Sequence, residues 1–350
     1  MNATIVAFFN NKGGVGKTTL VYHLAWMYQD LGLRVIASDL DPQANLTAAF
    51  LDDDRLMELW PANSHPSTMF GAVRPLLRGT GDIADPGLES ITDALGLLAG
   101  DLALSTFEDQ LSETWPKCLG GDEQERAFRV TTAFWRIMQN SANRHGSDVV
   151  LMDLGPNLGA INRAALIAAD YVVVPLSPDL FSLQGLRNLG PKLRSWRSDW
   201  TKRREAGGKL DFQLPPGSIQ PVGYVVQQHS VRLDRPVKAY ERWIDQVPAE
   251  YATSVLGQQP GASPTVKDDP NCLAQLKHYR SLIPMAQESR KPMFHLKPAD
   301  GAMGSHYQAA QSARRDFQAL AEQIAQRCGV PIRQGLWPMD APSSTGASRS

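Results

Sequence analysis

The segment Lys12-Gly13-Gly14-Val15-Gly16-Lys17-Thr18-Thr19 combines glycines, lysines and threonines at a spacing that suits phosphate binding. Glycines let backbone N–H groups turn inward around phosphate oxygens, and a helix that starts there adds the positive end of its dipole. We expect the side chain of Lys17 to reach the terminal phosphates and the Thr18 hydroxyl to hold Mg²⁺. An ordinary glycine turn is the alternative, but the predicted strand before the segment and helix after it favour a phosphate site.

Carboxylates follow two other apolar segments. Asp39 and Asp41 end a predicted strand, and at positions i and i+2 of an extended chain they point the same way. Asp153 follows four apolar residues, so it lies at a strand tip where it could hold Mg²⁺ directly or through water. In isolation, an Asp-Pro turn or a strand that merely ends in Asp would explain them equally well. At the ligand-binding edge of one parallel sheet, they predict a nucleotide site with magnesium.

The elements that must position these residues alternate between β-rich runs and helical segments. The predicted strands are Thr4–Phe9, Arg34–Ser38, Asp148–Met152, Tyr171–Pro175 and Val222–Val226. Continuous apolar runs such as VVLM and YVVV are typical of strands buried on both faces. The pattern therefore predicts an α/β fold in which a mostly parallel, twisted sheet carries helices on both faces.

Helical spacing of apolar residues predicts a first helix from about residue 16 to 31, with Gly32 placed to end it. A further helix is expected near 128–137 and a long one near 305–327. We expect a single domain over residues 1–330 with insertions near 51–147 and 228–280, followed by a mobile tail at 331–350. These irregular regions are interpreted first as loops and surface insertions, with a partner surface as the alternative.

The composition argues against several other classes of protein. The 350 residues carry a formal net charge of -1, so no global charge indicates nucleic acid binding. Cys118, Cys272 and Cys328 are far apart and form no CxxC pair, which argues against cysteine-ligated zinc or iron–sulfur sites. Sparse cysteines fit a reducing compartment, and no apolar run reaches the ~18 residues of a membrane span. We therefore expect a cytoplasmic protein that makes no use of a membrane.

Three motifs resemble those of a known family. The string KGGVGKTT resembles the signature of the deviant Walker A ATPases, the group that contains ParA, Soj and MinD. Its start departs from the general pattern G-x-x-x-x-G-K-[ST], because Asn11 stands at the first position and a second lysine, Lys12, follows. Residues 39–45, DLDPQAN, are similar to the family's DxDPQxN, and residues 153–159 keep the proline and the later glycine of its D-x-P-P-x-x-G pattern.

The resemblance implies a role for each residue. Lys12 would reach across a dimer that sandwiches two nucleotides and contact the partner's phosphates, as an arginine finger does. Asp41 would orient or activate the attacking water, Asp39 would lie near the Mg²⁺ shell, and the loop after Asp153 would respond to loss of the third phosphate. With ATP and Mg²⁺ as cofactors, the implied sites are Lys12, Lys17 and Asp41 for catalysis, Lys12 to Thr19 for the nucleotide, and Thr18, Asp39 and Asp153 for the metal.

The resemblance is closest to the ParA branch. Residues 174–186, VPLSPDLFSLQGL, are similar to the ParA pattern, and the segments at 283–284, 291–293 and 305–327 resemble its C-terminal portion. Nitrogenase-reductase-like members need paired cysteines, and MinD-like members carry a C-terminal amphipathic helix that QGLWPMDAPSSTGASRS does not resemble. The predicted first strand begins at about residue 4, so we expect no N-terminal helix-turn-helix domain. Gln227, at a strand end, is a candidate for an adenine contact.

ParA-like dimers bind DNA without sequence preference, which directs attention to a basic segment at 187–209 with eight basic and two acidic residues. Leucines and tryptophans from 186 to 200 recur at helical spacing, so this segment is predicted to be an amphipathic helix whose Trp stripe packs in the core. A merely solvated face is the alternative. The DNA-binding candidates are Lys192, Arg194, Arg197, Lys202, Arg203 and Arg204, with a weaker cluster at Arg232, Arg235, Lys238 and Arg242.

The sequence therefore predicts an ATP-dependent dimerisation switch that hydrolyses ATP and binds nonspecific DNA, for plasmid or chromosome partition or for cargo positioning. A protein partner would stimulate hydrolysis, and the protein could associate with the nucleoid. The alternative is an ATP-gated dimeric module that docks a protein effector in a regulatory or defence system without binding DNA; the long segments at 51–147 and 228–280 motivate it. An amide-forming ligase with a related phosphate loop is a third interpretation, against which Lys12 argues.

Overall fold

A computed structural model of the chain describes residues 2–61, 65–227, 242–259, 265–279 and 281–332. Eight strands form one sheet in the order β3-β4-β2-β5-β1-β6-β7-β8. The strands are β1 (Thr4–Phe8), β2 (Val35–Asp39), β3 (Glu89–Ser90), β4 (Leu95–Leu98), β5 (Val149–Asp153), β6 (Tyr171–Leu176), β7 (Gln220–Gln227) and β8 (Cys272–Leu276). Every neighbouring pair is parallel except β3 and β4, which are antiparallel.

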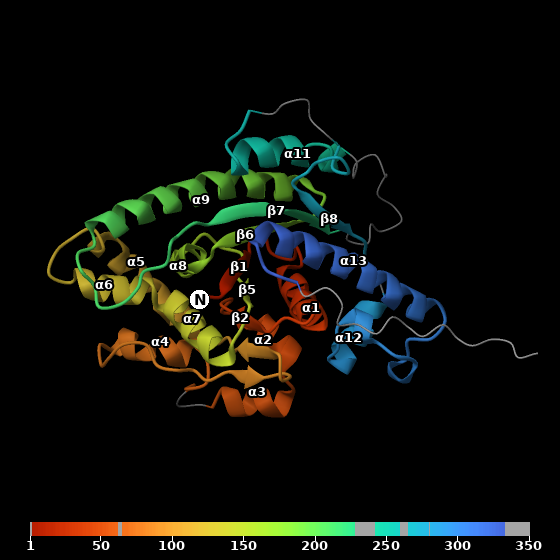
Figure 1. Ribbon diagram of the computed structural model, residues 1–350, viewed down its shortest axis with the longest axis horizontal. Coiled ribbons are helices and arrows are strands. Elements are labelled where there is room, and N and C mark those ends of the chain that lie inside the picture. Colours follow the sequence, from red (N-terminus) through yellow and green to blue (C-terminus); the bar gives the residue numbers. More distant parts are fainter. Residues whose placement is uncertain (1, 62–64, 228–241, 260–264, 280, 333–350) are drawn as a thin grey trace, which may run out of the picture.

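Helices cover both faces of the sheet. The helices are α1 (Lys17–Asp30), α2 (Asn45–Phe50), α3 (Asp53–Leu59), α4 (Met69–Arg78), α5 (Phe107–Lys117), α6 (Gln124–Thr131), α7 (Ala133–His145), α8 (Ala160–Ala168), α9 (Leu180–Ala206), α11 (Val247–Glu250), α12 (Leu282–Ser289) and α13 (Ser305–Cys328), with the short turns η1 (Leu102–Thr106), η2 (Tyr251–Val255), η3 (Met293–His295) and η4 (Pro298–Asp300). In Figure 1, α1, α12 and α13 lie on one side of the sheet, and α5 to α9 lie on the other.

Successive side chains of a strand point into two separate hydrophobic cores, one on each face of the sheet. Ile5 and Ala7 of β1 join the core beneath α4 to α9, whereas Val6 and Phe8 join the core beneath α1, α2, α12 and α13. All four side chains are essentially inaccessible to solvent. Because side chains alternate along a strand, an apolar residue at every position is what a strand buried on both faces requires. The predicted fold class, a mostly parallel sheet with helices on both faces, is confirmed.

The five predicted strands are all present, and their ends differ from the prediction by at most two residues. The sequence patterns missed β3, β4 and β8. Residues 51–147, expected to hold loops and surface insertions, instead supply β4 to the main sheet and helices α3 to α7, with β4 pairing with β2. β4 has only four residues, LGLL, and its glycine interrupts the apolar pattern, so its signal is weak.

The long helices follow the predictions closely. The first helix is α1, and the C-terminal helix is α13. The helix expected near 128–137 is divided between α6 and α7, which meet at Thr132. Trp196 and Trp200 of α9 are buried, so the predicted packing of the Trp stripe in the core is confirmed. Residues 228–241 of the second expected insertion and 333–350 of the expected tail lie outside the described residues.

Candidate functional site

The phosphate loop connects β1 to α1 at the edge where the parallel strands end. Gly14 has a φ of 71° and Gly16 a φ of 78°, in the left-handed region that glycine adopts without steric cost. Gly16 is the N-cap of α1, so the helix begins at the loop and directs its N-terminal N–H groups toward it. The Lys17 Nζ donates a hydrogen bond to the Lys12 carbonyl oxygen across the loop, at 3.3 Å.

Asp153 lies directly against the start of α1. The Thr18 hydroxyl donates to its Oδ2 at 2.6 Å, while its Oδ1 is buried with no hydrogen-bond partner. Burial, together with the charge of Asp39, raises the pKa of Asp153 to about 8; the Thr18 hydrogen bond and Lys17 oppose the shift. Burial likewise lowers the pKa of Lys17, against the opposing effect of Asp153. A cation beside the unpartnered Oδ1 would offset the cost of burying this charge, so Asp153 is suited to bind one.

Asp39 lies beside Asp153, its register partner on the neighbouring strand, but both of its oxygens are already engaged. Its Oδ2 accepts hydrogen bonds from the backbone N–H and the hydroxyl of Thr47, each at 2.8 Å, and its Oδ1 accepts from the Asp41 N–H at 3.3 Å. The Thr47 hydroxyl also accepts from the Gly100 N–H at 2.7 Å. In this geometry Asp39 anchors the loop after β2, and its position near the Mg²⁺ shell stays a prediction. Burial raises its pKa to about 7, against the Thr47 hydrogen bonds.

Asp41 faces the pocket beside the phosphate loop. It is mostly buried, its Oδ1 accepts the Gln43 N–H at 3.0 Å, and it lines a pocket with the phosphate loop. A Cβ atom on Gly155 would lie 3.2 Å from this Oδ1, so the carboxylate faces the loop that follows Asp153. Asn162 restrains that loop, because its Nδ2 donates a hydrogen bond to the Gly155 carbonyl at 2.8 Å.

The residues at this site fit a magnesium ion that is coordinated jointly by the protein and by the phosphates of a nucleotide. Within the described residues, no three His, Cys, Asp or Glu side chains come together as a metal-binding group. Mg²⁺ typically keeps several waters and takes one or two protein oxygens together with substrate phosphates. Thr18 and the unpartnered Oδ1 of Asp153 supply that small set of donors, whereas a dedicated protein cage would need more.

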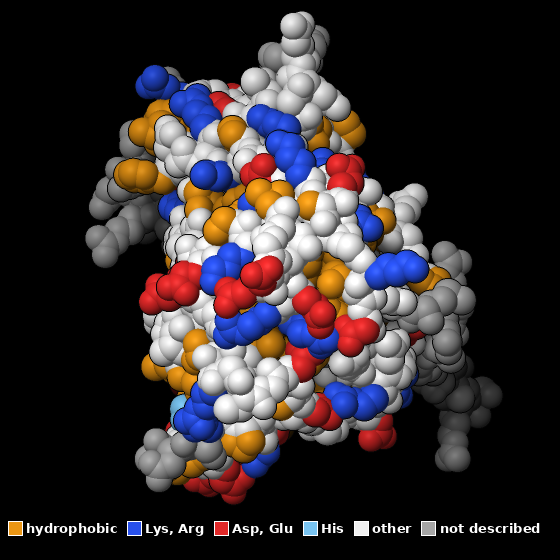
Figure 2. Space-filling model, turned by 90° about the vertical axis from the view of Figure 1, so that its left-hand side faces the viewer, with side chains coloured by type: hydrophobic (Ala, Val, Ile, Leu, Met, Phe, Trp, Pro, Cys, Tyr) orange, Lys and Arg blue, Asp and Glu red, His pale blue; other side chains and the backbone are white. Residues whose placement is uncertain are grey.

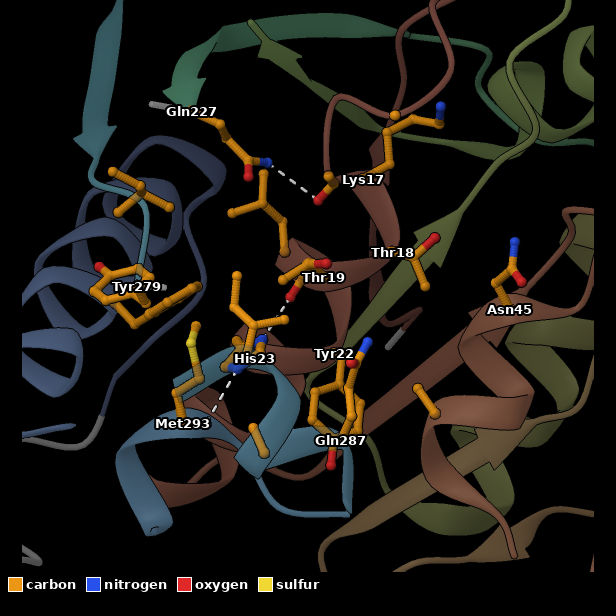
Figure 3. Close-up of a pocket in the computed structure, with 18 of the residues that line it drawn as sticks. Lys17, Thr18, Thr19, Tyr22, His23, Asn45, Gln227, Tyr279, Gln287 and Met293 are labelled. Atoms are coloured by element: carbon orange, nitrogen blue, oxygen red, sulfur yellow. Dashed lines mark hydrogen bonds between the residues drawn. The ribbon is translucent and has the colours of Figure 1, made fainter. Parts of the chain in front are cut away.

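A pocket of about 810 Å³ continues from the phosphate loop toward the C-terminal part of the chain. Figure 3 shows Gln227 at the end of β7, Tyr279 after β8 and Met293 from η3 around this hollow, with Thr19 and His23 from α1. Gln227 is the candidate adenine contact predicted from the sequence, whereas the wall formed by 276–279, 283–293 and Phe317 was not predicted. The segments at 283–284 and 291–293, which resemble the C-terminal portion of ParA, are the sequence signal for this wall.

Gln227 lies over the phosphate loop itself. Its Nε2 donates to the Gly16 carbonyl oxygen at 3.1 Å. A Cβ atom on Gly16 would lie 2.4 Å from the Gln227 Oε1, so a larger residue there would displace the glutamine side chain, in addition to the strain at its φ. Within the same wall, His23 is fixed by Thr19 and η3: its Nδ1 lies 2.7 Å from the Thr19 carbonyl and its Nε2 accepts the Met293 N–H at 3.2 Å. These contacts join α1 to the C-terminal segment.

The predicted DNA-binding residues all lie on α9, but they differ in exposure. Arg203 is 7% exposed, with its guanidinium 3.9 Å from the Trp115 ring centroid and its Nε donating to the Trp115 carbonyl at 2.9 Å. It cannot present its charge to DNA, which corrects the assignment made from sequence. Lys192, Arg194, Lys202 and Arg204 are exposed, and Arg197 is half-buried.

The other three arginines donate to backbone carbonyls of neighbouring segments, and the Arg204 guanidinium does so to Pro216 at 3.1 Å. The Arg194 guanidinium donates to Ser254 and Val255, at 2.5 and 3.2 Å, and that of Arg197 donates to Ile219. Of the weaker cluster predicted from the sequence, residues 232–238 lie outside the described residues.

An additional layer covers part of the helix. α11 and η2 pack along the N-terminal half of α9, and Figure 1 shows α11 as the outermost element on that side. Gly190 of α9 makes room for this layer, since a Cβ there would lie 1.7 Å from the Ser254 carbonyl oxygen. The Arg187 Nε donates to the Glu250 carboxylate at 2.8 Å. On the side of the molecule that Figure 2 shows, Lys and Arg side chains are interspersed with Asp and Glu.

Comparison with known proteins places the chain in a family. The family profile described as an AAA domain matches residues 3–203, which is more than half of the chain. Protein IncC of Escherichia coli is 31% identical over 209 residues, covering 59% of this chain and 50% of IncC. The chromosome partitioning protein ParA of Caulobacter vibrioides is 29% identical over 204 residues, covering 58% of this chain and 67% of ParA. The match therefore spans about half to two thirds of these relatives.

A solved structure supports the fold over a larger part of the chain. A protein from Corynebacterium diphtheriae superposes with a TM-score of 0.67 at 23% identity, covering 93% of this chain and 98% of that one. Among the described helices, none has the length and apolar character needed to cross a membrane. The glycine loop at the start of α1, the acidic strand ends beside it and the matching family profile agree, and the chain belongs to the ParA/MinD-type P-loop ATPases.

Proposed function

We propose that this chain is a Mg²⁺-dependent ATPase whose ATP-bound form assembles into a homodimer, within one domain spanning residues 1–330. The observation that carries the ATPase assignment is the contact between Thr18 and Asp153, which leaves one buried carboxylate oxygen free beside Lys17. A threonine hydroxyl, a lysine and a carboxylate at a helix N-terminus are the groups that a magnesium-bound triphosphate needs. Bound Mg²⁺ would neutralise charge on the phosphates.

Each residue of the site has a proposed task. The backbone N–H groups of residues 12 to 19 bind phosphate oxygens, and Lys17 contacts the terminal phosphates. Thr18 and Asp153 hold the metal, and Asp39 keeps the loop after β2 in place through Thr47. Asp41, anchored by that loop and facing Gly155, orients the attacking water.

The remainder of the 810 Å³ pocket suits the nucleoside. Tyr279, Met293 and Phe317 offer apolar surface to a base, and the Gln227 amide can donate and accept hydrogen bonds at its edge. An anion at the phosphate loop and an apolar, partly enclosed extension are the two chemical environments of a nucleotide. The volume and apolar lining of this pocket therefore support a nucleotide over inorganic phosphate as the ligand.

Calorimetric titration with ATP and ADP, with Mg²⁺ or with EDTA, tests this assignment. Thr18→Ala should remove most of the Mg²⁺ dependence of ATP binding and the release of phosphate. A matched control is Thr201→Ala on α9, whose hydroxyl bonds to the Arg197 carbonyl at 3.1 Å. Equal ATP affinity with Mg²⁺ and with EDTA in the unaltered chain would refute the metal assignment.

Dimerisation and DNA binding rest on the family resemblance and on the relatives IncC and ParA. We propose that Lys12 contacts the phosphates of a second copy, and that exposed basic residues of α9 then bind DNA without sequence preference. The exposed set is smaller than the sequence suggested, because Arg203 is buried and Arg197 is half-buried. Arg194 is exposed, but its guanidinium donates to the Ser254 and Val255 carbonyls. A cytoplasmic protein carried on the nucleoid would result.

The layer over α9 favours a second candidate function, an ATP-gated module that docks a protein effector. α11 and η2 occupy the N-terminal half of the helix face that was expected to meet DNA. They leave Lys192, Arg194, Lys202 and Arg204 exposed among mixed charges, and Arg194 is hydrogen-bonded to η2, which makes a weak electrostatic footprint for a polyanion.

Binding to a random-sequence duplex with ATP, with ADP and without nucleotide, across a salt series, separates the two functions. ATP-dependent binding that weakens steeply with salt supports the DNA switch. Reversing Lys192, Lys202 and Arg204 to Glu should then reduce the salt slope by up to about three, since each phosphate contact contributes about 0.9. Lys117→Glu, on the exposed part of α5, is the matched control. Absence of DNA binding while ATP-dependent dimers persist in light scattering would favour the effector module.

A further inference from the structure

The two lysines of the phosphate loop have different partners. Lys17 is buried and turns back to the Lys12 carbonyl within the loop. The ammonium of Lys12 instead forms an ion pair with the Oδ2 of Asp179, at the start of α9. The same ammonium lies 6.0 Å from the ring centroid of the exposed Phe181, which is the outer limit of a cation–π contact. The charge of Lys12 is therefore neutralised within its own chain.

Asp179 is a fixed partner, because it also caps α9. Its Oδ1 accepts the Ser182 N–H at 2.9 Å, which makes it the N-cap of a helix of 27 residues. The helix is pressed against the loop close by: a Cβ on Gly185 would lie 2.9 Å from the Asn10 Oδ1 and 3.0 Å from the Asn11 Oδ1. The carboxylate that holds Lys12 thus belongs to a rigid element that packs on the base of the phosphate loop.

We propose that Asp179 is a positioning residue that holds Lys12 in its own chain, and that Lys12 must leave Asp179 before it can contact the phosphates of a second copy. The inference rests on the proposed function for the destination of Lys12. A terminal phosphate carries more negative charge than one carboxylate, so it competes for the ammonium where a weaker anion does not. The ion pair therefore raises the ATP concentration at which the dimer forms and disfavours assembly with ADP.

The pair is partly exposed, with side-chain accessibilities of 26% for Lys12 and 35% for Asp179. Solvent screens such a pair, so its effect on an equilibrium is about two- to fivefold. That range is large enough to shift a dimerisation midpoint and small enough for ATP to overcome. The pair tunes assembly without blocking it.

Asp179→Asn is the decisive variant. Asparagine caps helices as well as aspartate does, so α9 keeps its N-cap while the charge that holds Lys12 is lost. Asp199→Asn is the matched control, because it removes an aspartate of the same helix that lies 3.9 Å from Lys202, far along the chain from Lys12. Two measurements are made on each full-length chain: labelling of Lys12 by an amine-reactive reagent, read by peptide mass spectrometry, and dimer mass by light scattering across an ATP series and an ADP series.

The expected result is faster labelling of Lys12 in Asp179→Asn, with a dimerisation midpoint at about two- to fivefold lower ATP and detectable dimer with ADP. Asp199→Asn should match the unaltered chain in both measurements. Unchanged labelling in Asp179→Asn would overturn the ion pair, whatever the dimer does. Faster labelling with an unchanged midpoint would overturn the control of assembly. If the unaltered chain never dimerises with ATP, the proposed function fails, and the labelling comparison still decides whether Asp179 holds Lys12.

Discussion

Replacing Gly16 by alanine tests the geometry of the phosphate loop without any nucleotide. Gly16 has a φ of 78°, and a left-handed backbone costs a residue other than glycine about 1–2 kcal/mol. The new Cβ would also lie 2.4 Å from the Gln227 Oε1, so this side chain must move and lose its 3.1 Å hydrogen bond to the Gly16 carbonyl, worth about 1 kcal/mol. The free energy of unfolding should therefore fall by about 2–3 kcal/mol.

Gly14 provides the matched control for this change. Its φ is 71°, so Gly14→Ala carries the same backbone cost, but no atom outside its chain neighbours lies within 4 Å of the Cβ position. Only about 1–2 kcal/mol should be lost. Urea unfolding of both variants, in buffer without nucleotide, measures the difference that Gln227 makes.

A third chain, Gly16→Ala with Gln227→Ala, completes the cycle. Removing the glutamine side chain relieves the clash, so the double variant should be less destabilised than the sum of the two single variants. Equal losses for Gly14→Ala and Gly16→Ala, or strict additivity of Gly16→Ala with Gln227→Ala, would refute the placement of Gln227 over the loop.

Three other outcomes follow from the contacts described. Arg203→Ala should lower the free energy of unfolding by about 2–4 kcal/mol, because the buried guanidinium loses Trp115 and its carbonyl partners, whereas Lys202→Ala should change it by less than about 0.5 kcal/mol. Chemical denaturation measures both, and equal effects would contradict the burial of Arg203. The pKa of Asp153 is raised from 3.8 to about 8, so without Mg²⁺ its contribution to stability is present below about pH 4 and is lost as the pH rises to 8. The stability of Asp153→Asn relative to the unaltered chain should therefore increase from pH 4 to pH 8 in EDTA, and a flat difference would count against the buried carboxylate. Asp41→Ala should leave ATP binding within about threefold while slowing phosphate release by about 10²-fold or more, in single-turnover assays with Mg²⁺. Unchanged turnover would remove Asp41 from catalysis.

Local sequence patterns predicted most of the sheet and the phosphate loop. Strands such as β1 and β5 are apolar at successive positions because helices cover both faces of the sheet. A continuous apolar run is therefore enough to predict that its residues are buried. The loop was predictable for a similar reason: glycines, lysine and threonine act through neighbouring backbone groups, so the whole phosphate site lies within a few residues. β4 escaped prediction because four residues with a central glycine carry too little of either signal.

The partners of the charged residues were decided by the tertiary structure. Arg203 and Lys202 are adjacent in a basic run, yet one packs on Trp115 and the other is exposed, since the helix turns about 100° per residue and only one direction meets α5. Likewise Lys12 meets Asp179 because β1 and β6 are neighbours in the sheet and their following loops emerge together. Residue types and local spacing therefore determined the chemistry available to this chain, and strand order determined which of those groups meet, because contacts between distant segments leave no periodic trace in the sequence.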